Sequence, residues 1–259
     1  MLLLGQKWQL LEFPMCDHCP LPASPGETRR GFLRKLAGAA ATAGLIGSTR
    51  TAAQENSPRA VANSGWARIW TRHPEWDVHS DREERLIDFI RRDRELKFTA
   101  KLGVAHPANL EDLCKTPFLF SFDLTAMDDP QEWANLREYL YRGGFLYLDN
   151  CVHVSPDMQA FRHDHLLRLT RLLPASEMRR LSPEHPIYRA RYPIKLDQLP
   201  GDQKTSAEQH GALYGVFDDN RMVALLSLAH LFCGWPENPG IVEACMKQLT
   251  NIYVYSRAH

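Results

Sequence analysis

Residues 136–149, LREYLYRGGFLYLD, decide the fold because the hydrophobic pattern changes in the middle of them. Leu136 and Leu140 lie on one stripe of a helix, and the Gly143-Gly144 pair then ends that helix. Residues 145–149 form a nearly continuous apolar run, which is typical of a strand covered on both faces. A helix followed directly by a fully buried strand is the repeating unit of α/β sheets.

The same alternation continues along the chain. A capping box at Ser80–Glu83 predicts the start of a helix, and Asp129-Pro130 with Glu132 predicts another. Further helices are expected at 155–173 and 241–255, and strands at 66–70, 96–100, 117–122, 213–217 and 222–226. The pattern predicts a three-layer, doubly wound α/β domain with a mainly parallel sheet and an antiparallel edge hairpin around residues 218–221.

Residues 28–54, TRRGFLRKLAGAAATAGLIGSTRTAAQ, read as a targeting signal. The pair Arg29-Arg30 precedes a weakly apolar stretch and small residues that suit cleavage after Ala53, which is the layout of a twin-arginine signal peptide. The apolar stretch is shorter than the ~20 residues that a membrane span needs. An Ala-rich surface helix and an uncleaved export anchor are the alternatives.

This interpretation divides the chain into three parts. We expect a leader and signal peptide at 1–53, a linker at 54–64 and one α/β domain at 65–259. The leader contains Cys16-Asp17-His18-Cys19, but this CxxC lacks a second pair and precedes the export signal, so we assign no function to it. The expected location is the periplasm, and the expected partners are the twin-arginine export machinery and an unknown envelope protein or small ligand.

Charge and cysteine content exclude several classes of function. Residues 1–53 hold six of the 31 basic and three of the 31 acidic residues, which leaves the exported chain with a net charge of −3 when histidine is neutral. Such a chain has no electrostatic footprint for nucleic acid, and no later apolar run is long enough for a stable membrane span. Its cysteines, Cys114, Cys151, Cys233 and Cys245, do not form a disulfide framework, although an oxidising compartment would permit a bridge.

Several blocks of the domain carry a resemblance. They are, in order, PFLFSF (117–122), LREYLYRGGFLYLDNC (136–151), FRHDHLLRLTRLLP (161–174), HPIYRA (185–190), GVFDDNRMVALLS (215–227) and CGWPEN (233–238). In this order they resemble the domain-of-unknown-function family 4159 over roughly residues 66–259. The block YLYRGGFLYLDN also resembles the helix–Gly-Gly–strand step of the class I glutamine amidotransferase-like fold, which is a flavodoxin-like sheet. The resemblance implies this fold and an envelope setting; it implies no established activity.

The chain departs from this resemblance at two places. Many relatives look like Thr-Gly-His-Gly where this chain has Ser121-Phe122-Asp123-Leu124, so a role for that histidine has no counterpart here. Before Cys233, relatives often look like Asn-Asp-Leu, whereas this chain has Ala229-His230-Leu231.

Candidate site residues follow the buried strand at 145–149. Ligands of open α/β sheets bind beyond the carboxyl ends of the strands, where Asp149, Asn150, Cys151 and His153 are expected. Cys151 is a candidate nucleophile if an imidazole accepts its proton, with Asp149 and His153 as the other catalytic candidates. The tight Gly-x-Cys-x-Gly elbow of the true amidotransferases is absent, however, because Asn150 and Val152 flank the cysteine.

Two other readings of these residues stay open. Asp149, Asp123 and His153 could form a metal or ligand site. Alternatively, Asp149 and Asn150 could hold the loop by binding neighbouring backbone amides.

Cys233-Gly234-Trp235 is a second candidate ligand-binding segment, since glycine allows close approach and tryptophan offers a flat surface. The alternative is a packed loop before the last helix. His163 and His165 point about 160° apart on a helix and therefore cannot share one ion. His165 lies on the same stripe as Phe161 and Leu169, so it is expected at the edge of the core.

The sequence therefore predicts an exported, non-catalytic domain that binds a ligand or a protein, with no cofactor. No P-loop, GxGxxG, HExxH or GxSxG motif occurs. The alternative is a hydrolase or amidase that uses Cys151 or a metal near Asp149.

We predict that the exported protein begins at Gln54, and that replacing Arg29 and Arg30 by lysine keeps it in the cytoplasm, because the export machinery recognises the arginine pair. Immunoblots of cell fractions and the intact mass of the periplasmic protein measure both outcomes. Arg50→Lys is the control and should leave export unchanged. A periplasmic protein whose N-terminus lies upstream of Arg29 would contradict the prediction.

Overall fold

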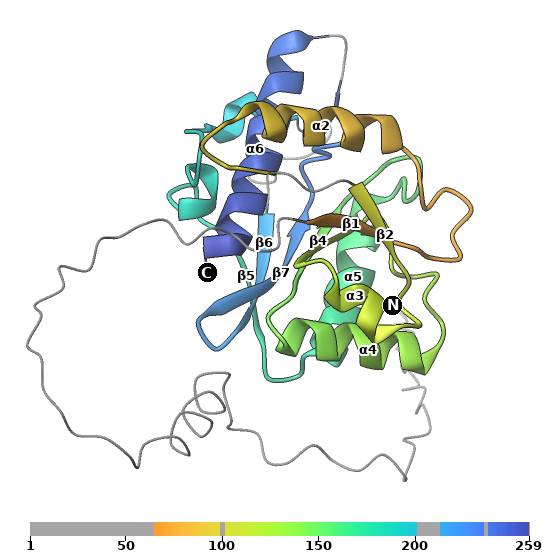
Figure 1. The fold of residues 1–259 in the computed structure, drawn as a ribbon. Helices are drawn as coiled ribbons and strands as arrows, with labels where there is room; N and C mark the ends of the chain where they lie inside the picture. Colours follow the sequence, from red (N-terminus) through yellow and green to blue (C-terminus); the bar gives the residue numbers. More distant parts are fainter. Residues whose placement is uncertain (1–64, 99–101, 201–212, 236–237, 259) are drawn as a thin grey trace, which may run out of the picture. The chain divides into compact units, whose positions relative to one another are not determined.

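The strands form one mixed sheet with helices on both faces (Figure 1). The structure is a computed structural model that describes residues 65–98, 102–200, 213–235 and 238–258, all of which belong to the unit Ser57–His259. The strands are β1 (Trp66–Ile69), β2 (Leu102–Ala105), β3 (Phe118–Ser121), β4 (Phe145–Asp149), β5 (Glu177–Arg180), β6 (Leu213–Asp218) and β7 (Arg221–Ser227). The α-helices are α2 (Ser80–Arg92), α3 (Leu110–Cys114), α4 (Pro130–Tyr141), α5 (Met158–Leu172) and α6 (Pro239–Ala258), and the short 3-10 helices are η1 (Pro186–Tyr188) and η2 (Leu196–Gln198).

The sheet is parallel except at one edge. Its order is β2-β1-β3-β4-β7-β6-β5, in which β6 and β5 run antiparallel to their neighbours. The order 2-1-3-4 followed by a fifth parallel strand is that of flavodoxin-like sheets, with β7 as the fifth strand. The predicted fold class is therefore confirmed, including the antiparallel edge hairpin β6–β7.

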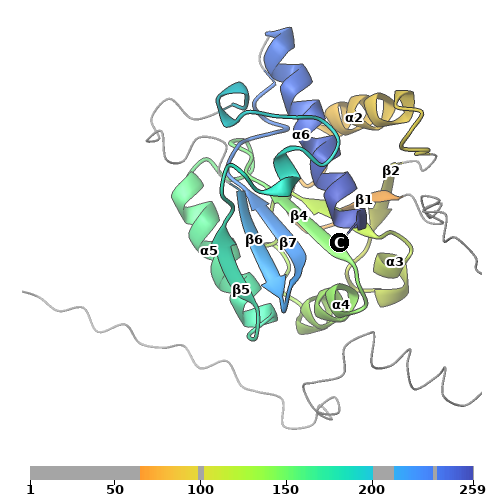
Figure 2. The ribbon, with the colours of Figure 1, turned by 90° about the vertical axis from the view of Figure 1, so that its left-hand side faces the viewer.

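Two apolar cores cover the two faces of the sheet, because successive side chains of a buried strand point in opposite directions. In β4, Phe145 and Tyr147 join the core under α2 and α6, whereas Leu146 and Leu148 join the core under α3, α4 and α5. Figures 1 and 2 show α2 and α6 on one side of the sheet and α3 and α4 on the other. The nearly continuous apolar strand in the sequence thus reflects burial on both faces.

One expected strand lies elsewhere, and two elements were not expected. The strand expected at 96–100 lies instead at Leu102–Ala105, where Gly103 lies opposite Ala67 of β1. Leu96 lies in a turn and packs against the core under α2 and α6, and Phe98, just after that turn, is buried in this core. The sequence also gave no signal for α3 or for β5, whose residues Glu177–Arg180 are mostly exposed at the antiparallel edge and carry no apolar alternation.

The first helix begins differently from the predicted capping box. The N-cap of α2 is His79, in the left-handed conformation (φ 60°) and without a side-chain capping bond, and Ser80 is the first helical residue. Glu83 points inward, where it accepts hydrogen bonds from Trp66 Nε1 (2.7 Å) and Arg68 Nε (2.5 Å). Arg68 is 3% exposed, so its buried guanidinium requires a charged partner. The Glu83 carboxylate therefore pairs with Arg68 and does not cap the start of α2.

The start of α4 follows the prediction more closely. Asp129 caps the helix by accepting from Gln131 N at 2.8 Å, and Pro130 occupies the first helical position. Glu132 does not close a box, because its carboxylate pairs with Arg72 at 3.0 Å.

We predict that Glu83→Ala lowers the free energy of unfolding by about 3–5 kcal/mol, because it leaves the buried Arg68 guanidinium unpaired. Glu84→Ala, one position along the same helix and exposed, is the matched control and should change stability by less than about 0.5 kcal/mol. Urea denaturation measures both variants. A loss in Glu83→Ala no larger than in the control would show that the ion pair carries no net stabilisation.

Candidate functional site

The carboxylate of Asp149, at the end of β4, is fully buried and bonded to a loop. It accepts hydrogen bonds from the backbone amides of Leu231 (3.2 Å) and Phe232 (2.8 Å). Burial raises the pKa of Asp149 to about 7, although these amides and the Ser227 hydroxyl favour the charged form. The carboxylate thus holds the loop that follows β7, which is the arrangement expected from the structural reading of this residue.

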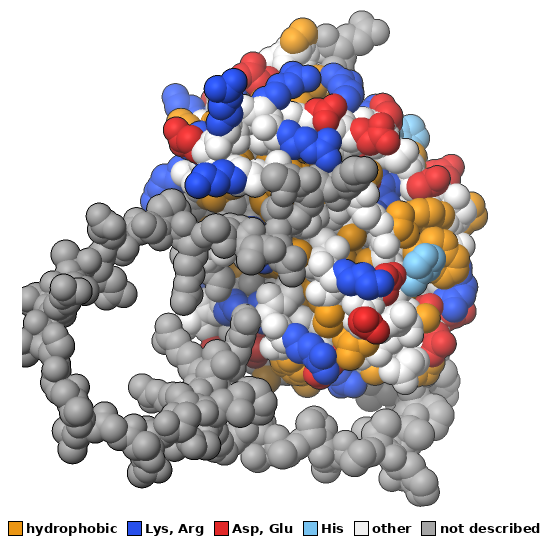
Figure 3. Space-filling model, in the orientation of Figure 1, with side chains coloured by type: hydrophobic (Ala, Val, Ile, Leu, Met, Phe, Trp, Pro, Cys, Tyr) orange, Lys and Arg blue, Asp and Glu red, His pale blue; other side chains and the backbone are white. Residues whose placement is uncertain are grey.

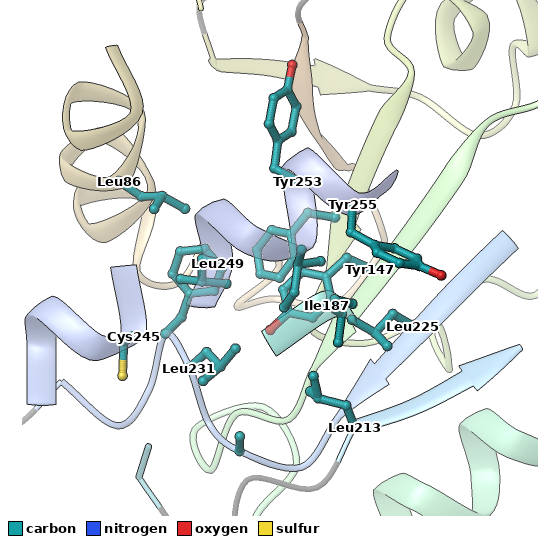
Figure 4. Close-up of a cluster of buried hydrophobic side chains, with 14 of the residues drawn as sticks. Leu86, Tyr147, Ile187, Leu213, Leu225, Leu231, Cys245, Leu249, Tyr253 and Tyr255 are labelled. Atoms are coloured by element: carbon teal, nitrogen blue, oxygen red, sulfur yellow. The ribbon is translucent and has the colours of Figure 1, made fainter. Parts of the chain in front are cut away.

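Asn150 takes part in the same junction. Its backbone amide donates to Ser227 O at 3.0 Å, its Nδ2 donates to Ser155 O at 3.2 Å, and its carbonyl lies 3.2 Å from His230 Nδ1. Apolar burial fixes the loop as well, since Leu231 packs in the cluster with Cys245 and Leu249 of α6 (Figure 4). The ends of β4 and β7 are therefore joined by polar and apolar contacts together.

Two cysteines and one histidine meet at this edge of the sheet. Cys151 Sγ lies 3.3 Å from Cys233 Sγ, and Cys233 Sγ lies 3.5 Å from His79 Nε2. All three donor atoms lie within 4.8 Å of one another. Cys151 is buried, whereas Cys233 and His79 are partly exposed, so the cluster reaches solvent from one side. We call these three residues the thiol–imidazole cluster.

The pKa values of the two thiols shift in opposite directions. The hydrogen bond with Cys151 lowers the pKa of Cys233, and His79 strengthens this effect. The same hydrogen bond, together with burial, raises the pKa of Cys151. Of the two, Cys233 is therefore the thiol that ionises more easily.

Buried polar contacts place the two exposed members of the cluster. Arg68 donates from Nη1 to the carbonyls of Trp76 (2.8 Å) and Val78 (2.7 Å), which fixes the chain just before His79. Arg82 of α2 donates from Nη1 to the carbonyls of Phe232 (2.5 Å) and Cys233 (3.1 Å). The two arginines thereby hold the segments that carry the imidazole and the partly exposed thiol.

The other predicted site residues lie apart or are occupied. Asp123 accepts from Thr125 N and Oγ1 at 2.7 and 2.5 Å, and its Oδ1 lies 3.1 Å from the buried His165 Nε2. His165 is thus part of the core, as expected, and His163 is exposed. His153 is exposed, with its ring 5.2 Å from the ring of His79.

The predicted ligand-binding segment Cys233-Gly234-Trp235 is mostly packed against the rest of the domain. Trp235 is 8% exposed, its indole donates to Leu231 O at 2.5 Å, and the Arg85 guanidinium covers its ring at 5.0 Å. Gly234 is required for packing, because a Cβ there would meet Pro200 at 2.6 Å. Of this segment, Cys233 supplies the side chain that joins the cluster.

Lys and Arg side chains are interspersed with Asp and Glu on the face shown in Figure 3. Among the helices of the described residues, none combines the length and apolar character that a membrane crossing requires. The predicted signal residues Arg29, Arg30 and Ala53, the linker at 54–64 and the Cys16/Cys19 pair lie outside the described residues.

The fold and the cluster define a class: a flavodoxin-like α/β domain with thiols and an imidazole at the carboxyl edge of its sheet. Within this class the chain belongs to the family described as Domain of unknown function (DUF4159), whose model matches residues 66–256. This confirms the family resemblance seen in the sequence. No curated protein matches the sequence.

We predict that Asp149→Ala destabilises the protein by about 2–4 kcal/mol at pH 5, because two buried amides lose their acceptor. The folded pKa of about 7 lies above the ordinary value of 3.8. The contribution of this carboxyl group is therefore full near pH 4 and is lost as the pH rises through 7, so the difference from wild type should shrink by about 2 kcal/mol between pH 5 and pH 8.

Urea denaturation at both pH values measures this difference. Asp164→Ala, an exposed position on α5, is the control and should show no such pH dependence. A difference that stays constant or grows toward pH 8 would mean that Asp149 is ionised in the folded protein at pH 5.

Proposed function

We propose that the protein is exported through the twin-arginine route and acts in the periplasm as a domain that binds a ligand or another protein without catalysis. The signal at residues 28–54 supports export. The observation that carries the binding role is that the Asp149 carboxylate is buried and already accepts hydrogen bonds from the Leu231 and Phe232 amides. It therefore does not face a substrate. A carboxylate in that position is unavailable as a general acid or base.

The proposed nucleophile is also poorly placed for hydrolysis. Cys151 is 0% exposed, and its sulfur lies against the Cys233 sulfur at 3.3 Å. Attack on a carbonyl requires an accessible thiolate and a nearby base. The flavodoxin-like sheet and the Gly143-Gly144 step support a relation to the class I glutamine amidotransferase-like fold. The strained cysteine elbow of those enzymes is absent from this chain.

One observation favours a hydrolase as the second candidate, and it moves the nucleophile from Cys151 to Cys233. Cys233 is a partly exposed residue, its sulfur lies 3.5 Å from the His79 imidazole, and the pKa of its thiol is lowered. This is the pairing that activates cysteine nucleophiles. Among the described residues, no acidic side chain contacts the His79 imidazole, so the third group that would orient it is missing there.

Hydrolysis of L-glutamine and of p-nitrophenyl acetate by the purified protein separates these two functions. We predict that wild type and Cys233→Ala release product at the same rate, because background reaction with solvent is all that remains. The readouts are chromatographic product formation and the intact mass of the protein after incubation. A wild-type rate at least tenfold above Cys233→Ala, with an acylated mass in wild type, would establish the hydrolase and refute the binding role.

A further inference from the structure

The thiol–imidazole cluster takes its donors from three separate segments. His79 precedes α2, Cys151 follows β4, and Cys233 lies in the loop after β7. Such convergence of soft donors is unusual, because each segment must be held independently. Three protein donors therefore meet at one edge of the sheet, which is the number that an open tetrahedral zinc site uses.

Two of the three donor–donor distances fit a tetrahedral ion better than a disulfide. Zinc bonds of about 2.3 Å to sulfur and about 2.05 Å to nitrogen place two thiolates ~3.8 Å apart and a thiolate ~3.5 Å from an imidazole nitrogen. The Cys233–His79 distance of 3.5 Å matches, and the 3.3 Å between the two sulfurs is about half an ångström short. A disulfide needs about 2.05 Å, a larger change in the opposite direction.

The backbone at His79 also supports a site at sulfur. His79 turns its ring toward sulfur instead of capping α2, and it does so from a left-handed backbone that costs free energy in a non-glycine residue. Thiolates with an imidazole select zinc(II) or copper(I) over the oxygen-loving magnesium and calcium ions.

We propose that His79, Cys151 and Cys233 bind one soft transition-metal ion of the zinc type. This deepens the proposed function by naming the ligand class, and it rests on that function only in assigning binding to this edge of the sheet. Two thiolates neutralise the double charge of the ion, and three protein donors leave the fourth tetrahedral position to water or an external donor on the solvent side. Asp149 contributes by holding the loop of Cys233 and is not a ligand.

Titration of the purified, reduced and chelator-stripped protein with Co²⁺ and Zn²⁺ tests this proposal. We expect one equivalent to bind, with a thiolate-to-cobalt charge-transfer absorption that zinc abolishes. His79→Ala and Cys233→Ala should each weaken binding by more than about 100-fold, beyond the effect of outer-shell changes. Cys114→Ala, an exposed cysteine at the end of α3, is the matched control and should bind normally.

Outcomes that would overturn the proposal are equally defined. They are the absence of stoichiometric binding by wild type, binding that survives in both His79→Ala and Cys233→Ala, and a Cys151–Cys233 disulfide whose reduction restores no metal uptake. Circular dichroism of the variants confirms that they are folded. Substrate turnover is measured separately, so the two proposals can fail independently. A protein that binds no ion and hydrolyses nothing would refute the metal site alone. A metal-bound protein that turns over substrate would refute the non-catalytic role alone.

Discussion

The hydrogen bonds from the Leu231 and Phe232 amides to the Asp149 carboxylate are the contact on which the carboxyl edge of the sheet depends. They join the ends of two neighbouring parallel strands, β4 and β7, and so bring Cys233 over Cys151. Desolvation opposes the charge of this carboxylate strongly enough to bring its pKa to about 7. The chain tolerates that cost because two buried amides in a loop would otherwise have no acceptor.

A second buried contact completes the edge from the other side. Arg68 of β1 pairs with Glu83 of α2 and binds the two carbonyls that precede His79. Strand β1 thus positions His79 through the buried Arg68. Strands β4 and β7 position Cys151 and Cys233 through the buried Asp149 and the loop amides that it binds. Buried polar groups are stable only with their partners, so loss of either contact is expected to disturb the cluster and the fold together.

The sequence predicted most of the fold because burial on both faces leaves a strong signal, as in residues 145–149. Strands without that signal were missed or shifted, as with the polar edge strand Glu177–Arg180 and with Leu102–Ala105. The sequence singled out Asp149 and Cys151 from their places after a strand, and Cys233 as part of a loop with Gly234 and Trp235. The sequence could not single out His79, because its role arises from the tertiary contact with Cys233. The capping-box pattern at Ser80–Glu83 was misleading for a similar reason, since Glu83 accepts a hydrogen bond from the buried Arg68.

X-ray absorption spectroscopy of the zinc-loaded protein tests most directly whether these three segments converge on one ion. Two sulfur atoms at about 2.3 Å and one imidazole nitrogen at about 2.0–2.1 Å should form the first shell, with one light atom in the remaining position. A shell made only of nitrogen and oxygen, or one with a single sulfur, would contradict the joint placement of Cys151 and Cys233 at the metal.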